Sequence, residues 1–356
     1  MRRTPVLIIG GGPAGSAAAI GLARAGAMPV VVERSAGPRD LVCGGFLGWD
    51  ALAQLRKLGL DPAALGARPI GRVRLIAGGR VVDKRLPKLA AGLSRRALDA
   101  ALLRLAEEAG ATVLRGRAAR AVEGREVRLD DGEIWSADAL FVATGKHELR
   151  GVAREYGTRK VSVGLRAAFM PSAEVARELA GKVELHLYDG GYAGLLLQED
   201  GQVNLCLSVA QARMSKGREA LLAALLWESP ALAARIGRQA LDWEAIAGVP
   251  YGWRARATEP GVYRLGDQAA VIGSVAGDGV AIALASGIAA AQACLHGDGP
   301  GARAYQKAFA RRAARPIRAA ELLRHMVEHP GERGLMMKLA RVGGLARIWA
   351  RLMRIG

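Results

Sequence analysis

A glycine-rich turn between an apolar run and a small-residue helix is the feature that most constrains the fold of this chain. Residues 6–9 (VLII) are apolar without helical periodicity, residues 14–25 are rich in alanine, and between and within them Gly10, Gly12 and Gly15 have G-x-G-x-x-G spacing. The order strand, tight turn, helix brings backbone N–H groups close to a pyrophosphate at a helix N-terminus. We therefore predict a βαβ unit that binds a dinucleotide.

Each glycine of this turn has its own expected role. Gly10 allows the sharp turn out of the strand, Gly12 lets the backbone approach the pyrophosphate, and Gly15 lets the helix lie close to the sheet. A second apolar run, residues 29–32, ends at Glu33. An acidic side chain about 20 residues after the turn is expected to bind the ribose of the dinucleotide.

The first residues also resemble an export signal, because Met1-Arg2-Arg3 precedes an uncharged run. A signal peptide needs about 7–15 continuous apolar residues. Here three glycines and Pro13 interrupt the run after Ile9. We therefore interpret this stretch as folded structure and expect a cytoplasmic protein.

The length of 356 residues favours two lobes over a single core. The three cysteines are too few and too scattered for a disulfide framework or a four-ligand zinc site, which suits a reducing compartment. His325 and His329 have i, i+4 spacing but no third ligand near them in the sequence. We predict no metal site and interpret the two histidines as a solvated helix face.

The net charge of +18 raises the question of a nucleic-acid partner. Aromatic residues make up only 4% of the chain, and none alternates with basic residues as a stacking surface for bases requires. We therefore expect no nucleic acid. Residues 301–356 carry 13 Lys and Arg against 3 Asp and Glu, so this basic segment holds more than half of the net charge.

The middle of the chain has the period-2 pattern of half-buried antiparallel strands. Apolar residues alternate within residues 161–165, 183–187 and 203–209. The intervening side chains are polar or small and include Glu184, His186, Tyr188, Asn204, Cys206 and Ser208. We predict a second sheet with one polar side, covered by helices at residues 218–227 and 231–240.

Residues 279–297 are uncharged, close to the roughly 20 residues that a membrane-spanning helix needs. They are mostly alanine and glycine and contain Ser286, Gln292 and His296. A helix packed closely under a cofactor explains this composition better than a membrane span.

Several motifs in order make the chain resemble a known family. After the glycine turn come Glu33-Arg34, Ser94-Arg95 at a helix start with Asp99, Ala143-Thr144-Gly145, Gly266-Asp267, and Gly277-Asp278-Gly279-Val280 before an alanine-rich helix. This set resembles the FAD-dependent oxidoreductases of the p-hydroxybenzoate hydroxylase and geranylgeranyl reductase group. The resemblance covers about residues 6–293 and is weakest in the middle.

The resemblance implies an extended FAD, with its pyrophosphate at the Gly10 turn, its adenosine ribose at Glu33 and its ribityl chain at Asp267. It also directs the helix that follows Gly279 toward the N1/C2 carbonyl region of the flavin, where reduction places negative charge. The residues expected to bind FAD are Gly10, Gly12, Ala14, Gly15, Glu33, Arg34, Cys43, Gly44, Arg95, Thr144, Gly145, Gly266, Asp267, Gly277, Gly279 and Val280.

Together these observations predict an α/β fold in three parts. A Rossmann-like FAD-binding domain comprises residues 1–72, 94–159 and 255–300. An interleaved antiparallel-sheet substrate domain comprises residues 73–93 and 160–254, and a basic helical segment comprises residues 301–356.

Three functions fit this reading. The one we place first is an NAD(P)H-using monooxygenase that hydroxylates an apolar, aromatic or lipid-like small molecule in a water-poor pocket. The second is a geranylgeranyl-reductase-like flavin enzyme that reduces a double bond of an isoprenoid or lipid. The third is a non-catalytic flavoprotein or membrane-surface adaptor.

Two residues are candidates for the chemistry. Val42-Cys43-Gly44-Gly45 resembles the Cys-Gly-Gly segment of geranylgeranyl reductases, so Cys43 either tunes or protonates at the flavin or is a small buried thiol. Tyr192 is a second candidate proton donor. The Trp-x-Phe-Pro element of those reductases is replaced by GYAGLL at residues 191–196, and the Trp-x-Trp-x-x-Pro run of halogenases is absent.

The basic segment alternates arginines with apolar residues at roughly helical spacing between residues 311 and 354. Either its helices pack on the body of the protein with the arginines in water, or they form a basic amphipathic surface on an anionic membrane. The substrate, the choice between NADH and NADPH, and the oligomeric state stay open.

Overall fold

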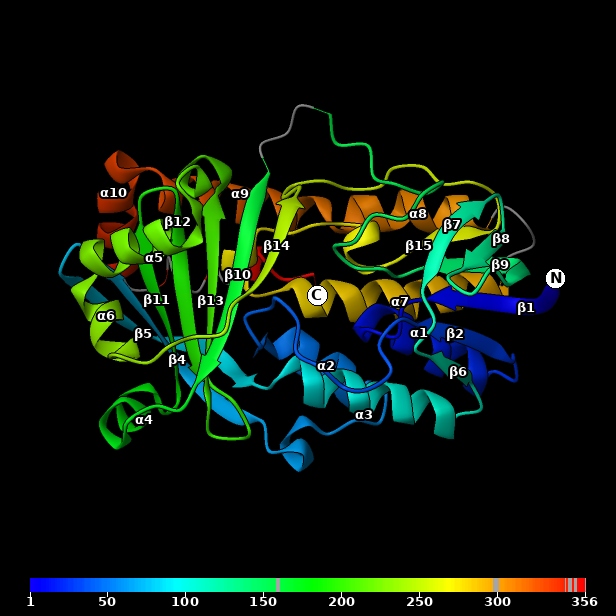
Figure 1. Cartoon of the computed structure of the whole chain (residues 1–356), viewed down its shortest axis with the longest axis horizontal. Coiled ribbons are helices and arrows are strands. Elements are labelled where there is room, and N and C mark those ends of the chain that lie inside the picture. Colours follow the sequence, from blue (N-terminus) through cyan, green and yellow to red (C-terminus); the bar gives the residue numbers. More distant parts are fainter. Residues whose placement is uncertain (158–160, 297–300, 343, 345–347, 349–350, 356) are drawn as a thin grey trace.

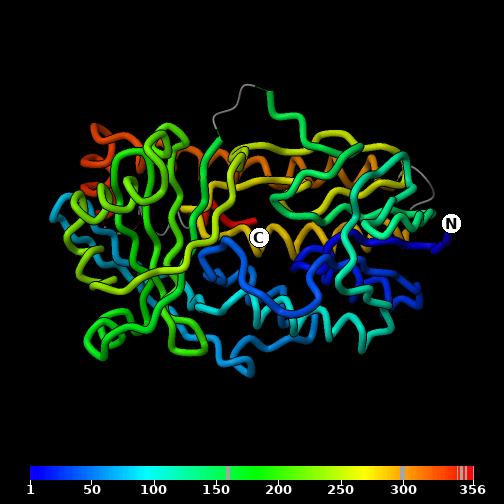
Figure 2. The backbone as a smooth tube through the Cα atoms, viewed as in Figure 1, coloured from blue at the N-terminus to red at the C-terminus, as the bar shows by residue number. Residues whose placement is uncertain are grey.

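Two β-sheets stand at opposite ends of an elongated molecule, with helices running between them (Figure 1). The computed structural model describes residues 1–157, 161–296, 301–342, 344, 348 and 351–355. The N-terminal strand lies in one sheet, at one end of the molecule, whereas residues 351–355 return to its middle (Figure 2).

The first sheet is built around the predicted βαβ unit. Its order is β6-β2-β1-β9-β8-β7, with β15 paired to β9. Strands β6, β2, β1, β9 and β15 are parallel, and β8 and β7 continue the sheet antiparallel. The strands are β1 (Arg2–Ile9), β2 (Pro29–Glu33), β6 (Thr112–Arg115), β7 (Ala119–Glu123), β8 (Glu126–Leu129), β9 (Ile134–Val142) and β15 (Val262–Arg264).

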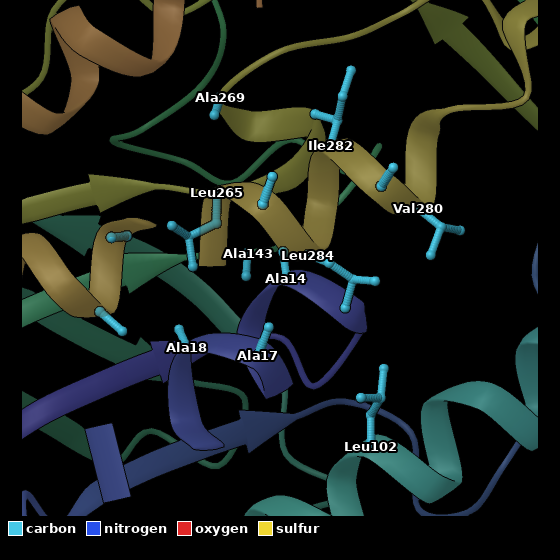
Figure 3. Packing of buried hydrophobic residues seen from close by; sticks show 14 of the residues in the cluster. Ala14, Ala17, Ala18, Leu102, Ala143, Leu265, Ala269, Val280, Ile282 and Leu284 are labelled. Atoms are coloured by element: carbon cyan, nitrogen blue, oxygen red, sulfur yellow. The ribbon is translucent and has the colours of Figure 1, made fainter. Parts of the chain in front are cut away.

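Small residues bring two helices of this part into direct contact. Ala14, Ala17 and Ala18 of α1 (Pro13–Arg24) meet α7 (Gly279–His296) in Figure 3. A Cβ at Gly287 of α7 would lie 2.2 Å from the carbonyl oxygen of Ala14, so only glycine fits there. Ser94 caps α3 (Arg95–Glu108) as predicted, and α2 (Trp49–Lys57) contacts α7.

The second sheet has eight strands in the order β14-β10-β13-β12-β11-β4-β5-β3. These are β3 (Phe46–Leu47), β4 (Arg68–Ala77), β5 (Arg80–Gly92), β10 (Ser162–Phe169), β11 (Lys182–Tyr188), β12 (Gly191–Leu197), β13 (Val203–Ala210) and β14 (Glu244–Val249). Helices α4 (Ala173–Leu179), α5 (Gly217–Glu228) and α6 (Pro230–Ile236) belong to this part. The sequence patterns missed β14 and extended the last helix to residue 240, past the helix end at Ile236.

The register of the second sheet corrects the prediction of a single polar side. Glu184 pairs with Leu195, whereas Leu185 pairs with Gly194, which in turn pairs with Cys206. Because side chains alternate between the faces of a sheet, Glu184 and Cys206 lie on opposite faces. The Glu184 face packs against α5 and α6 through Leu195, Leu205 and Leu207, and the Cys206 face is turned toward the first sheet.

Glu184 is fully buried, and a cluster of charged side chains surrounds it. Its carboxylate accepts hydrogen bonds from Arg235 (Nε, 2.9 Å) and Arg74 (Nη1, 3.4 Å) and lies 2.8 Å from His186 Nε2. Burial by itself raises the pKa of the Glu184 carboxyl, but the hydrogen bonds from His186 and Arg235 outweigh it and lower the pKa to about 2. The cluster therefore ties α6 to β11 and β4.

Three further helices, α8 (Gly301–Arg312), α9 (Ala314–Glu328) and α10 (Pro330–Arg341), follow α7. Helix α8 contacts β15, whereas α9 and α10 pack on β11, β12, β4 and β5 of the second sheet. Among the described helices, α7 alone has the length and apolar composition of a membrane span, and half of it is buried inside the fold.

We expect Glu184→Gln to lower the free energy of unfolding by about 3 kcal/mol at pH 7, because removing one partner of a buried ion pair leaves the other uncompensated. The folded-state pKa lies below the ordinary value of 4.5, so this stabilisation is present above pH 4.5 and is lost as the pH falls toward 2. Denaturant unfolding of both proteins across this pH range measures the effect. Glu178→Gln, which removes the half-exposed partner of Arg235, should cost less than about 1 kcal/mol; equal losses in the two variants would contradict the account.

Candidate active site

A cavity of about 1360 Å³ lies between the two sheets. This volume exceeds the roughly 300–1,000 Å³ of ordinary small-molecule sites, so it has room for a dinucleotide and a second molecule. Every residue predicted to bind FAD lines the cavity except Gly15, and Tyr192 lines it as well. The structure thus gathers in one place residues from the two ends of the sequence, and their contacts with a cofactor stay predictions.

The glycine turn lies where three parallel strands end. Gly10 has φ +102°, and a Cβ there would lie 2.4 Å from the carbonyl oxygen of Ala143, which follows β9. Gly15 does not face the cavity: a Cβ there would lie 1.9 Å from the carbonyl oxygen of Gly10. Gly15 therefore packs against the backbone of the turn on the side away from the cavity. Gly12 faces the cavity, and a Cβ added there would have Arg95 Nη2, at 3.4 Å, as its nearest neighbour.

Glu33 links the glycine turn to the loop that follows β2. Its carboxylate accepts hydrogen bonds from the N–H groups of Gly11 (2.7 Å) and Ser35 (2.8 Å). Arg34 lies beside it on the cavity wall and contacts His147 Nε2 at 2.7 Å. The predicted contact between Glu33 and a ribose would add to this structural role.

Arg95 lies over the glycine turn and is fixed by the next turn of α3. Its guanidinium donates to both carboxylate oxygens of Asp99, at 2.8 and 2.6 Å. Burial raises the pKa of the Asp99 carboxyl, and the charge of Arg95 acts against that rise. Arg104, Arg115, Arg117 and Arg120 also line the cavity, where Arg115 is paired with Glu107 and Arg117 with Asp131. The positive side chains of this wall suit the two phosphates of a dinucleotide.

Lys146 is a cavity residue to which the sequence analysis gave no role. Its ammonium donates to the carbonyl oxygen of Val42 at 3.0 Å. Burial by itself lowers the pKa of Lys146, but the Asp267 carboxylate nearby outweighs burial and the pKa is raised. Lys146 therefore stays charged. It directly follows the Thr144-Gly145 motif, and this position is the sequence signal from which it could have been found.

Two tyrosines and a serine form a hydrogen-bonded group on the wall near the second sheet. The hydroxyl of Tyr251 donates to Ser274 Oγ at 2.9 Å, and Ser274 also bonds the hydroxyl of Tyr192. Burial raises the pKa of Tyr192 well above its ordinary value, so it remains a neutral phenol. Burial likewise raises the pKa of the Cys206 thiol, to about 12, with Cys43 close by.

Beyond these tyrosines the cavity becomes apolar. The second sheet contributes Val73, Leu75, Leu86, Val183, Leu185, Leu187 and Leu196, and α9 and α10 contribute Leu323, Met326, Val327, Met336, Leu339 and Ala340. Met336 and Val327 belong to one buried hydrophobic cluster with Leu187. The apolar branch is therefore bounded by the sheet on one side and by two helices of the basic segment on the other.

Comparison with known proteins decides which cofactor this cavity suits. Residues 3–150 match a family model described as an FAD binding domain. This match fits the FAD-dependent oxidoreductase group. The residues present fit FAD: the cavity is large, its glycine turn admits close approach, and its basic end matches two phosphates. No group of three potential metal ligands occurs among the described residues.

The relatives of this flavoprotein include proteins named as reductases. It is 33% identical over 218 residues to menaquinone reductase of Mycobacterium tuberculosis. This alignment covers 56% of this chain and 53% of that protein, so the chain matches about half of the relative's length. It is 28% identical over 318 residues to menaquinone reductase of Mycolicibacterium smegmatis, covering 83% of this chain and 77% of that one. A geranylgeranyl bacteriochlorophyll reductase-like protein of Thermoplasma acidophilum has the same fold, with 19% identity, a TM-score of 0.78 and coverage of 98% and 96% of the two chains.

We expect Gly12→Ala and Gly15→Ala to fail in different ways. Gly12 has φ −71° and no close neighbour, so its alanine variant should fold normally yet bind FAD at least about tenfold more weakly, because the methyl group occupies the approach to the pyrophosphate. The methyl group of Gly15→Ala would collide with backbone, which costs about 1–3 kcal/mol or more. Thermal melting of the apoprotein and FAD titration separate the two effects. A Gly12→Ala variant with wild-type FAD affinity would contradict the assignment of this turn.

Proposed function

We propose that this flavoprotein reduces carbon–carbon double bonds of a long apolar molecule, an isoprenoid or the side chain of a lipid quinone. The apolar branch of the cavity carries this proposal, because most of the side chains that the second sheet, α9 and α10 contribute to it are aliphatic, with Lys84 and Arg85 of β5 as exceptions. The names of the relatives, menaquinone reductase and geranylgeranyl bacteriochlorophyll reductase-like protein, support it.

FAD, once reduced by a nicotinamide or another two-electron donor, would supply a hydride to one carbon of the double bond. The second carbon must take a proton from the protein, and Tyr192 is suited to give it. Its buried phenol is neutral and lies at the junction of the cofactor end and the apolar branch. Ser274 hydrogen-bonds to it and accepts in turn from the hydroxyl of Tyr251, so this pair can pass a replacement proton to the resulting phenolate. The aliphatic walls exclude water, which protects the transferred hydride from side reactions.

Anaerobic single turnover tests the reaction itself. We expect the protein, reduced with dithionite, to convert a menaquinone with an unsaturated isoprenoid chain into a product that is still heavier by two hydrogen atoms after the quinone ring has been reoxidised in air, as seen by mass spectrometry. A quinone without the side chain should give no such product. If no saturated product forms, and aerobic turnover with NAD(P)H instead consumes O₂ and yields a hydroxylated product, the monooxygenase that we placed first from sequence is the function.

The two candidate proton donors can be told apart by matched variants. We expect Tyr192→Phe, which keeps the ring and removes the hydroxyl, to lower the rate of double-bond reduction by about 100-fold or more. Cys43→Ala should lower the rate much less. Because the pKa of Tyr192 is raised, the wild-type rate should not fall between pH 7 and 9 on account of this donor. Stopped-flow reoxidation of the flavin by substrate gives these rates, and a larger loss in Cys43→Ala would reverse the assignment.

The same helices that wall the apolar branch also suit an anionic membrane surface, from which such a substrate would come. Leu322 of α9, Leu335 and Leu339 of α10, and Val342 are exposed, and Arg318, Lys338 and Arg341 are exposed among them. Exposed leucines beside basic residues are the pattern of an interfacial helix. The opposite face of α10 is packed, with Met336 and Met337 buried, so both sequence interpretations of this segment are compatible with the structure. Arg324 is not solvated as expected, because it is paired with Glu321 and Glu328, and Leu345, Arg347 and Trp349 lie outside the described residues.

We expect Leu335→Ser to weaken binding to phosphatidylglycerol vesicles at low salt several-fold, since it removes apolar area from this surface. Met28→Ser changes a more exposed apolar position, between α1 and β2 beside the first sheet, and should leave binding unchanged. Vesicle co-sedimentation measures both, with phosphatidylcholine vesicles and high salt as references. Equal binding by both variants and the wild type would exclude a membrane role for α10.

A further inference from the structure

Arg354 is a buried charge on the cavity wall that the function described above does not use. The spacing of the basic segment predicts a solvated helical face for it, but its side chain is only 7% exposed and lines the cavity. Residues 351–355 bring it back to the middle of the molecule, far from the end of α10 (Figure 2). The neighbouring residues Met353 and Ile355 are also buried.

An ion pair fixes Arg354 at the start of α7. Its Nη1 donates to Asp278 Oδ1 at 2.6 Å, and the N–H of Ile355 donates to Asp278 Oδ2 at 3.2 Å. Asp278 directly precedes α7, where a capping residue would bond the first N–H groups of the helix. Its carboxylate bonds residues 354 and 355, and the first helical residue, Gly279, faces open space in the cavity.

The guanidinium is held in one orientation on its remaining sides. Its central carbon lies 4.3 Å from the centre of the Trp49 ring. A Cβ added to Gly48 would lie 2.4 Å from Nη1, so the guanidinium occupies the space that a side chain at residue 48 would need. Its Nε is buried without a hydrogen-bond partner among the described residues. Leaving such a donor unpaired is costly, so the guanidinium is strongly desolvated on this side.

The ion pair presents its positive end to the cavity. Arg354, Gly277 and Gly279 line the wall, whereas Asp278 stands behind them and is only 1% exposed. The N-terminus of α7, an 18-residue helix, adds the positive end of its dipole at the same corner. Two independent sources of positive potential therefore converge on one corner of a cavity that suits FAD.

We propose that Arg354 faces the bound flavin and stabilises the negative charge that reduction places on its carbonyl-bearing ring. Two-electron reduction with uptake of one proton leaves one negative charge on the ring. A guanidinium held at a desolvated corner favours that charged form, because the Coulomb interaction is stronger where water is excluded. Asp278 is then a positioning residue, which holds the guanidinium and residues 351–355 against α7. This proposal rests on FAD binding and is independent of which substrate the flavin reduces.

The midpoint potential of the bound FAD tests this role. We expect Arg354→Met to weaken binding of the reduced form relative to the oxidised form by about tenfold or more, a fall of about 30 mV for a two-electron couple. The potential is measured by anaerobic dithionite titration with a reference dye, in protein loaded with FAD. Arg354→Lys should retain most of the potential. Arg351→Met removes an exposed arginine from the same segment and should leave the potential unchanged.

A second variant keeps the test decisive if Arg354→Met does not hold FAD. Gly48→Ala places a methyl group where the guanidinium rests, at a position with ordinary backbone angles (φ −66°), so it displaces the charge without removing it. It should lower the potential in the same direction. An unchanged potential in FAD-loaded Arg354→Met, an equal fall in Arg351→Met, or, where Arg354→Met fails to load, an unchanged potential in Gly48→Ala would each overturn the proposal. Failure of double-bond reduction leaves these readings unaffected.

Discussion

Backbone-to-backbone contact around the glycine turn is the constraint on which the rest of this structure depends. Gly15 lies against the carbonyl of Gly10, Gly10 against that of Ala143, and Gly287 against that of Ala14, at separations that no Cβ could enter. These contacts hold α1, α7 and the ends of β1 and β9 together (Figure 3). Their consequence is that residues more than 250 positions apart in the sequence form one wall of the cavity.

The cavity has two chemically different ends because two different sheets enclose it. The parallel sheet ends in loops and helix N-termini, which present N–H groups and arginines suited to phosphates. The second sheet presents the aliphatic face of β4, β11 and β12, and α9 and α10 cover that face. An apolar chain lying in this branch would reach the cofactor end beside Tyr192 and Ser274. In the proposed reduction, the cofactor would supply the redox chemistry, and the chain would supply positioning and a proton.

Local patterns in the sequence predicted most of the first sheet and many residues that the structure gathers on the cavity wall. The glycine spacing, the Ser94 cap and the small residues of α7 each have a cause within a few residues, so they could be read directly. The two faces of the second sheet could not, because strand register depends on pairing with distant strands. Glu184 and Cys206 look alike in a period-2 pattern, yet one is locked in an ion-pair cluster and the other lines the cavity. Arg354 was misplaced for a similar reason: its partner Asp278 lies 76 residues earlier, and nothing local marks the pairing.

We propose that one cavity holds both FAD and an apolar chain, with the chain extending from the flavin into the apolar branch. A crystal structure of the protein with FAD and a bound menaquinone tests this most directly. We predict FAD extending from the Gly10–Gly12 turn to the start of α7, with the isoprenoid chain between the second sheet and α9–α10 and one of its double bonds beside Tyr192. An isoprenoid chain bound outside the apolar branch, or a branch filled by water while the chain lies elsewhere, would contradict the account.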